Sequence, residues 1–242
     1  MYTSTDFKEF LFIDIETAAQ YRDLSEVPEN LSKLWESKAE FQRKNEDGMQ
    51  DLSDEQIYEK CASWFPEFGK IICISIGQVK FDESGVPQTS NIRSFYGDNE
   101  KELLHEFNGT MQAVFNKNSS VKLVGHNIKR FDMPWIVKRS LINGLKVPHQ
   151  FHFQKQKPWE NCLVDTYEIW KFGGMNSTSL DLICAVFDIP SPKQDMSNDQ
   201  VSERYYEGQL EKIKTYCEGD VEATMNVMLK VSDMPILETP PF

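Results

Sequence analysis

The sequence has little of what marks a secreted or membrane-spanning protein. Its 242 residues include only five cysteines and no C-x-x-C pair, which argues against a disulfide framework and for buried free thiols in a reducing compartment. No signal peptide begins the chain, and no apolar stretch is long enough to cross a bilayer. Internal repeats and low-complexity tracts are also missing. These absences lead us to expect a cytoplasmic protein with no membrane partner.

Positive charge is scarce as well. The chain carries 26 Lys and Arg against 38 Asp and Glu, giving a net charge of −12 and a pI near 4.9. Half of that excess lies between residues 18 and 68, where twelve acidic residues face six basic ones. Nonspecific binding to long nucleic acid is usually driven by Lys and Arg, so this balance opposes it. If the protein binds nucleic acid, we therefore expect it to contact only a few nucleotides.

The first informative motif lies in the apolar run that begins at Phe10. The run is short and β-branched, as in a strand, and it is interrupted by Asp14 and Glu16. Side chains two apart in a strand share a face, so these two carboxylates point one way while Ile13 and Ile15 point the other. Like charges held side by side favour a bound cation, although an exposed strand end would present the same pattern.

A second motif lies on a long amphipathic helix expected from Gln209 to Val231. Tyr216 and Asp220 are spaced i, i+4, so both project from one helical face beside the apolar stripe. They can line a site at the edge of the helix. The plainer alternative is a core aromatic residue next to an ordinary surface acid.

The third motif is Asp132, which follows a short buried strand at 121–124 and the loop Gly125-His126-Asn127. A helical pattern after it ends at Asn143-Gly144, which places Asp132 at or near the helix N-cap. The positive end of a helix stabilises an anion that can still present an oxygen outward. Capping and metal binding are therefore compatible in this residue.

Taken in order, these motifs resemble the three exonuclease motifs of the DEDD superfamily of 3′-to-5′ exonucleases. The tyrosine four residues before the last aspartate resembles the tyrosine (DEDDy) subtype. The whole set is similar to the proofreading exonuclease domain of family B DNA polymerases, here without a polymerase domain following, as in a stand-alone version. Further likeness covers residues 8–17 and 69–231 and includes the segments 71–77, 163–166, 178–181 and 220–224.

The resemblance implies a metal-dependent hydrolase with two divalent cations, Mg²⁺ or Mn²⁺, which prefer hard oxygen ligands. Carried over, the metal ligands are Asp14, Glu16, Asp132 and Asp220, and Tyr216 orients the attacking water. The ordinary pKa of a tyrosine, about 10, favours a hydrogen-bonding hydroxyl over a full general base. The implied reaction is hydrolysis at the 3′ end of single-stranded or frayed nucleic acid, DNA favoured, to release nucleoside 5′-monophosphates.

Candidate substrate contacts surround these acids. Thr17 directly follows Glu16, whereas His126 and Asn127 are either contacts to the terminal nucleotide or a loop pair bonded to backbone. Phe131 either stacks on a base or belongs to the core. Basic residues nearby are candidate phosphate contacts or solvated surface: Lys129, Arg130, Lys138, Arg139, Lys155 and Lys157. Asp165 is expected to cap a helix and not to bind metal.

The expected fold is α/β, because strand patterns alternate with helical ones. Strands at 10–15, 71–79 and 92–95 precede a helix at 100–115, whose start has the capping pair Asn99 and Glu102. This order suggests an antiparallel meander joined to a parallel pair, and the resemblance implies a ribonuclease H-like mixed sheet flanked by helices. We expect one domain over residues 1–242, with a loose tail at 234–242.

The acidic segment 18–68 is expected to be a helical insert in that domain. Ser53 with Gln56 predicts the cap of a short helix bearing Ile57, Cys61 and Phe65, and a longer amphipathic helix is expected to carry Leu31, Leu34, Trp35 and Phe41. The insert either shapes access to the site, contacts a protein partner, or is a solvated cover.

Three other functions fit part of the pattern. An exoribonuclease of the same superfamily would differ in acting on RNA instead of DNA, and no residue in the sequence indicates which sugar is preferred. A catalytically silent nucleic-acid-binding module would keep the fold, but retention of all four acids and the tyrosine speaks against it. A haloacid-dehalogenase-like phosphatase also has an aspartate after its first strand. Such an enzyme would require a second aspartate where this chain has Glu16 and an acidic residue where it has Thr224.

Overall fold

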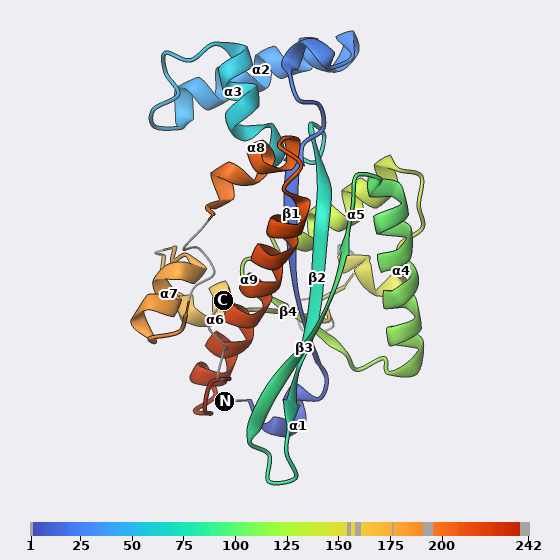
Figure 1. The fold of residues 1–242 in the computed structure, drawn as a ribbon, viewed down its shortest axis with the longest axis vertical. Helices are drawn as coiled ribbons and strands as arrows, with labels where there is room; N and C mark the ends of the chain where they lie inside the picture. The colour runs from blue at the N-terminus through green and yellow to red at the C-terminus, as the bar shows by residue number, and fades with distance from the viewer. Residues whose placement is uncertain (1, 154–155, 158–160, 176, 191–195, 238–242) are drawn as a thin grey trace.

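A five-stranded mixed sheet forms the centre of the molecule, with the order β3-β2-β1-β4-β5 (Figure 1). The computed structural model describes residues 2–153, 156–157, 161–175, 177–190 and 196–237. Strand β1 pairs antiparallel with β2, and β2 pairs antiparallel with β3, whereas β4 and β5 run parallel to β1. The predicted meander joined to a parallel pair is therefore confirmed. The strands are β1 Phe10–Ala19, β2 Gly69–Phe81, β3 Pro87–Tyr96, β4 Lys122–Gly125 and β5 Leu163–Asp165.

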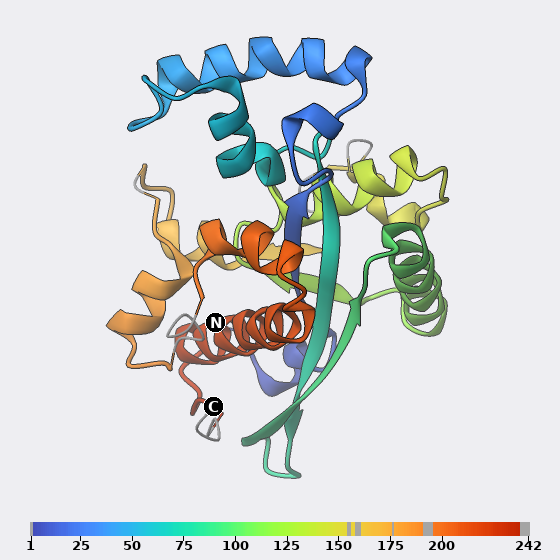
Figure 2. The ribbon, with the colours of Figure 1, turned by 45° about the horizontal axis from the view of Figure 1, so that its top comes forward.

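The two faces of the sheet are covered by different helices, α4 Glu100–Lys117 and α5 Asp132–Ile142 on one side and α9 Leu210–Val231 on the other (Figures 1 and 2). Alternation along β1 divides the core accordingly. Leu11 and Ile13 belong to the cluster that includes residues of α4 and α5, whereas Phe10 and Phe12 pack with residues of α9. Helix α9 follows the predicted span closely.

Helix ends agree with the sequence in most respects. The Asn99 side chain accepts the backbone N–H of Glu102 at the start of α4, but no reciprocal bond from the Glu102 side chain completes a capping box there. Helix α5 ends at Ile142, and Gly144 follows with φ of +70°, a backbone conformation that glycine tolerates best.

The acidic insert forms α2 Glu29–Asn45, α3 Asp54–Cys61 and the 3₁₀ turns η1 Leu24–Glu26 and η2 Ala62–Trp64, which lie at one end of the sheet (Figure 1). The predicted capping box of Ser53 and Gln56 is confirmed. Trp35 is fully buried, but Leu34 and Phe41, expected on the same apolar face, are exposed. The buried stripe of α2 instead follows the i, i+4, i+7 spacing of Trp35, Ala39 and Gln42, and both exposed residues lie beside it.

Short elements complete the chain: α1 Ser4–Phe7, η3 His149–Phe151, α6 Thr166–Lys171, α7 Leu180–Val186, η6 Asn198–Gln200 and α8 Val201–Tyr206. Within the described ranges no helix is long and apolar enough to span a membrane. The expectation of a loose tail is wrong for residues 234–237. Leu237 is buried in a cluster with apolar residues of α9, and its backbone N–H donates to Oδ1 of the buried Asn226 at 2.9 Å. Residues 238–242 lie outside the described part.

Candidate active site

Strand β1 places the first two acids on the face covered by α9. Ile13 and Ile15 lie in the cluster beneath α4 and α5, so the alternating Asp14 and Glu16 point the other way, as predicted. A register shift in the pairing with β2 falls directly after Glu16, between Glu16 and Thr17. Glu16 is 7% exposed, and Asp14 is partly buried. Two carboxylates are thus held beside each other with little water around them.

Helix α9 brings the third acid and the tyrosine to the same place. Tyr216 and Asp220 are 4% and 7% exposed; the charge of Asp220 raises the pKa of Asp14, and the charges of Asp14 and Glu16 act on the Tyr216 hydroxyl. Cys217 contacts the strand from the same helix, with its thiol 3.5 Å from Asp14 Oδ2. Cys217 is spaced i, i+3 from Asp220, which is the signal that could have identified it in the sequence.

Asp132 lies on the β4 side of β1, opposite to β2, just beyond the point where β4 stops pairing with β1. The last paired residue of β1 on that side is Phe12, and Gly125 ends β4 so close to Ile13 that an added Cβ would lie 3.0 Å from the Ile13 carbonyl oxygen. The chain then turns, and Asp132 becomes the first residue of α5, one position after the observed N-cap, Phe131, which agrees with its predicted place at or near the cap. The backbone N–H of Ile15 faces the Asp132 carboxylate.

Asp14, Glu16 and Asp132 lie in one poorly hydrated space, where the charge of Asp220 acts on all three. Burial raises the pKa of Asp14 well above its ordinary value, and Asp220 and Asp132 raise it further. Burial, then Asp14 and Asp220, do the same for the pKa of Glu16. Burial raises the pKa of Asp132 to about 7, although backbone amides partly oppose the rise. Closely spaced carboxylates of this kind are stabilised by a bound cation.

The Tyr216 hydroxyl stays protonated in this setting. Burial raises its pKa far above the usual range, and the charges of Asp220 and Glu16 raise it further. The group therefore acts as a neutral hydrogen-bonding hydroxyl, which agrees with the expectation from its ordinary pKa.

Asp165 holds the loop that delivers Asp132. It caps α6 by accepting the N–H of Tyr167 at 3.0 Å, as predicted. It also accepts the backbone N–H of Asn127 at 2.8 Å and that of Lys129 at 3.2 Å. Asn127 has φ of +61°, so these bonds fix a loop whose backbone is otherwise unfavourable for a residue with a side chain.

Two of the four candidate substrate contacts, Thr17 and His126, make side-chain hydrogen bonds within the protein. The Thr17 hydroxyl donates to the Ser63 carbonyl oxygen at 2.8 Å and so ties β1 to the insert. His126 Nδ1 lies 2.9 Å from Thr166 Oγ1, and Nε2 lies 3.1 Å from the Thr178 carbonyl oxygen. The other two, Asn127 and Phe131, are partly exposed in the loop before Asp132. The ring of Phe131 rests 5.7 Å from that of Trp135, which is core.

The basic residues near this loop fall into different environments. Arg139 is 4% exposed and makes a two-pronged ion pair with Glu100, so it is neither solvated surface nor a phosphate contact. Lys129 pairs with Glu168 at 2.5 Å, and the exposed Lys138 lies 3.6 Å from Glu67. Arg130 and Lys157 are exposed, and Lys155 lies outside the described residues.

The donor set fits a divalent cation. Ligand atoms of Asp14, Glu16 and Cys217 lie within 4.8 Å of one another, and Asp132 and Asp220 are close enough to shift the pKa of Asp14. Hard carboxylate oxygens suit Mg²⁺ or Mn²⁺, whereas the thiol adds a softer donor that the sequence analysis did not include.

The fold has known counterparts. The family B DNA polymerase of the hyperthermophilic archaeon Pyrobaculum calidifontis matches 92% of this chain at 14% identity and a TM-score of 0.52. The match covers 24% of the polymerase, so the chain spans about a quarter of that protein. E. coli exonuclease I in complex with a dT13 oligonucleotide matches 91% of this chain and 40% of its own, at 13% identity and a TM-score of 0.44. No curated protein matches the sequence.

The mixed sheet with helices on both faces is an α/β, ribonuclease H-like fold. This chain belongs to the family described as predicted 3′-5′ exonucleases related to the exonuclease domain of PolB, whose model matches residues 65–236. The match includes Asp132, Tyr216 and Asp220 but begins after β1. The evidence that Asp14 and Glu16 belong to the same site is therefore their position in the structure. The chain thus carries a 3′-5′ exonuclease domain, a kind that typically uses divalent metals.

Proposed function

We propose that this protein hydrolyses phosphodiester bonds at the 3′ end of single-stranded nucleic acid and releases nucleoside 5′-monophosphates. The observation that carries the proposal is the convergence of four carboxylates and a tyrosine from β1, α5 and α9 in a chain of an exonuclease family; Glu16, Asp132 and Asp220 are buried and Asp14 is partly buried. The relation of that family to the exonuclease domain of a DNA polymerase favours DNA as the substrate.

In this proposal Asp14, Glu16, Asp132 and Asp220 hold two divalent cations, Mg²⁺ or Mn²⁺. When bound, such ions neutralise charge at the phosphate and stabilise the attacking and leaving oxygens. The carboxylates come from strand β1 and from helices α5 and α9, so their geometry is set by the packed core before a ligand binds.

Tyr216 has the role of orienting the attacking water, as in the tyrosine subtype of these enzymes. Its hydroxyl is protonated at neutral pH because burial and neighbouring acids raise its pKa, so it positions water by hydrogen bonds and does not remove a proton. Asp165 supports Asp132 by fixing the preceding loop through two backbone N–H groups, those of Asn127 and Lys129.

Asn127 and Phe131 are the proposed contacts to the terminal nucleotide, because both are partly exposed next to Asp132. Thr17 and His126 are proposed to support the site through their bonds to Ser63, Thr166 and Thr178. Substitution of Asn127 or Phe131 by alanine is then expected to raise KM with little effect on metal binding.

We further propose that residues 1–242 act as one exonuclease domain that includes the insert. The insert shares a core with the end of β1 and with α8, through Ala19, Trp35 and the partly buried Tyr206. A version lacking residues 18–68 would lose every member of this cluster except Tyr206 and would uncover the Tyr206 side chain, so we expect it to be less stable than the full chain.

The proposed activity is tested with single-stranded DNA, RNA of the same sequence and blunt duplex DNA, each incubated with the protein and Mn²⁺ or with EDTA. We expect nucleoside 5′-monophosphates from the single strands, more from DNA than RNA, and none with EDTA. Cleavage of RNA alone would make the protein an exoribonuclease. Binding of oligonucleotide without cleavage would make it a silent binding module.

A further inference from the structure

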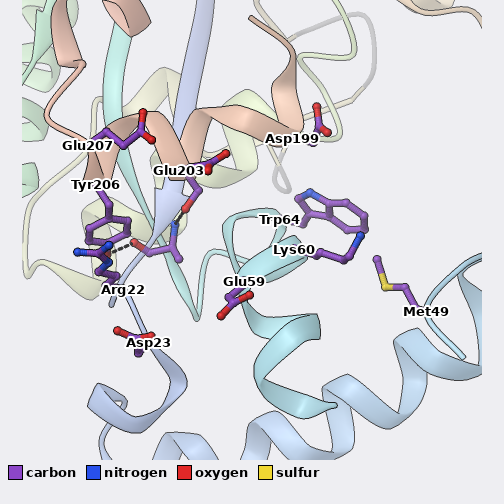
Figure 3. Close-up of a pocket in the computed structure, with 12 residues that line it drawn as sticks. Arg22, Asp23, Met49, Glu59, Lys60, Trp64, Asp199, Glu203, Tyr206 and Glu207 are labelled. Carbon is purple, nitrogen blue, oxygen red and sulfur yellow. Dashed lines mark hydrogen bonds between the residues drawn. The ribbon is translucent and has the colours of Figure 1, made fainter. Parts of the chain in front are cut away.

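A cavity of about 730 Å³ lies between the insert and α8, at the end of β1 (Figure 3). We call it the α3–α8 pocket. Its walls come from the insert, through Glu59, Lys60 and Trp64, and from α8, through Glu203 and Tyr206. None of the four candidate metal ligands lines it.

The pocket is strongly acidic. Its lining carries five carboxylates against Arg22 and Lys60, for a net charge of −3; the acids are Asp23, Glu59, Asp199, Glu203 and Glu207. Within the described residues only Glu207 among them makes an ion pair, with Arg204 at 3.5 Å. The other four carboxylates are exposed and make no ion pair within the described residues, so the negative electrostatic potential of the pocket attracts cations.

Trp64 adds an aromatic surface to that field. Its side chain is 43% exposed, although most large apolar residues of the insert are buried or partly buried, and Figure 3 shows its indole beside Lys60 on the side of the pocket formed by the insert. An exposed indole face attracts ammonium and guanidinium groups, and the attraction is strongest when carboxylates lie nearby to pair with the same cation.

This chemistry excludes the phosphate backbone as the occupant, since nucleic acid is held by excess positive charge and this lining has the opposite sign. A pocket of this size also exceeds what a single metal ion needs. We propose that the α3–α8 pocket binds a basic peptide segment of a partner protein, whose arginine or lysine side chains pair with the carboxylates and stack on Trp64.

The pocket lies beside the exonuclease site without using its residues. Ala19, on the pocket wall, lies three residues after Glu16 in β1. Its N–H donates to Ser202 Oγ at 3.1 Å, and its carbonyl oxygen accepts the Tyr206 hydroxyl at 2.9 Å (Figure 3). Peptide binding can therefore be measured without reference to catalysis.

The test measures binding of a fluorescein-labelled arginine-rich peptide to the full chain by anisotropy, beside a glutamate-rich peptide of equal length. We expect the arginine-rich peptide alone to bind, with affinity that falls as salt rises. Trp64→Ala is expected to raise Kd at least about threefold, and Glu59→Lys or Glu203→Lys about tenfold or more.

The matched control is Glu83→Lys, which makes the same charge change in the β2–β3 turn, at the opposite end of the molecule from the insert (Figure 1). It should leave Kd within about twofold of wild type. Equal effects of Glu83→Lys and Glu59→Lys would show that only overall charge matters and would overturn the proposal. So would a loss of oligonucleotide binding, instead of peptide binding, in Trp64→Ala.

Discussion

The thiol of Cys217 lies 3.5 Å from both the backbone oxygen and the Oδ2 atom of Asp14. A residue of the apolar stripe of α9 therefore contacts the first acid of the site. Burial raises the pKa of this thiol well above its ordinary value, and contact with Cys73 and the charge of Asp14 raise it further. Without a bound metal, the sulfur is a hydrogen-bond donor to the carboxylate.

Replacement of Cys217 by serine should change which metals the protein binds. Sulfur favours Zn²⁺ and Cd²⁺, whereas the carboxylates favour Mg²⁺ and Mn²⁺. We expect Cys217→Ser to weaken Cd²⁺ binding about tenfold or more while Mn²⁺ binding changes little. Calorimetric titration of the metal-free protein measures both. Equal losses for the two ions would show that Cys217 acts only by shaping the site.

The metal-free protein should lose stability as the pH rises from about 4 to 7. The pKa of Asp132 is about 7 in the folded chain and 3.8 ordinarily, so over that interval the folded state keeps a proton that the unfolded state releases. The pKa values of Asp14 and Glu16 are raised too, which adds to the loss. Thermal melting in EDTA measures the slope, which should be shallower in Asp132→Asn. Mn²⁺ at pH 7 should restore the melting temperature. A slope unchanged by Asp132→Asn would contradict this account.

Tyr216→Phe should slow turnover and leave metal binding in place. The change removes only the hydroxyl, which is not a proposed metal ligand, and keeps a buried aromatic ring. Loss of one positioned hydrogen-bonding group is expected to lower kcat by roughly 10²-fold or more. Mn²⁺-dependent thermal stabilisation provides the control and should equal that of the wild type. A normal kcat would remove the water-orienting role from Tyr216.

Arg139 should matter for stability far more than its neighbour Lys138. Its guanidinium pairs with Glu100 and also donates to the Pro66 carbonyl oxygen at 2.8 Å, while Glu100 accepts the Ile71 N–H at 2.7 Å. Removing one partner leaves a buried charge, so Arg139→Ala should cost about 3–5 kcal/mol of unfolding free energy.

The control, Lys138→Ala, removes an exposed pair and should cost no more than about 1 kcal/mol. Urea denaturation of both variants measures the two changes in unfolding free energy. Similar costs for the two would mean that the buried network adds nothing beyond a surface ion pair.

Local patterns were enough to predict much of this fold. The two-residue period of β1 assigned Asp14 and Glu16 to one face, and the cap at Ser53 located α3. Spacing along α9 correctly put Tyr216 and Asp220 together. These features depend on residues close in sequence, where backbone geometry dictates which side chains are neighbours.

Long-range packing accounts for what the sequence did not reveal. Arg139 looks like a surface base until α4 brings Glu100 to it, and His126 finds partners forty and fifty-two residues away. Cys217 is spaced i, i+4 from Ile213 and Val221, as in an apolar stripe, although the same position contacts Asp14. The pocket beside Trp64 needs both the insert and α8, which are far apart in the chain.

The most direct test follows a 5′-labelled single strand of DNA during incubation with the wild-type protein or with Asp14→Ala in Mn²⁺. The account predicts a ladder that shortens from the 3′ end with the wild type, and an intact strand with a folded Asp14→Ala variant of unchanged circular dichroism. A strand that stays intact with the wild type at high enzyme concentration, or a ladder that persists in the variant, would contradict it.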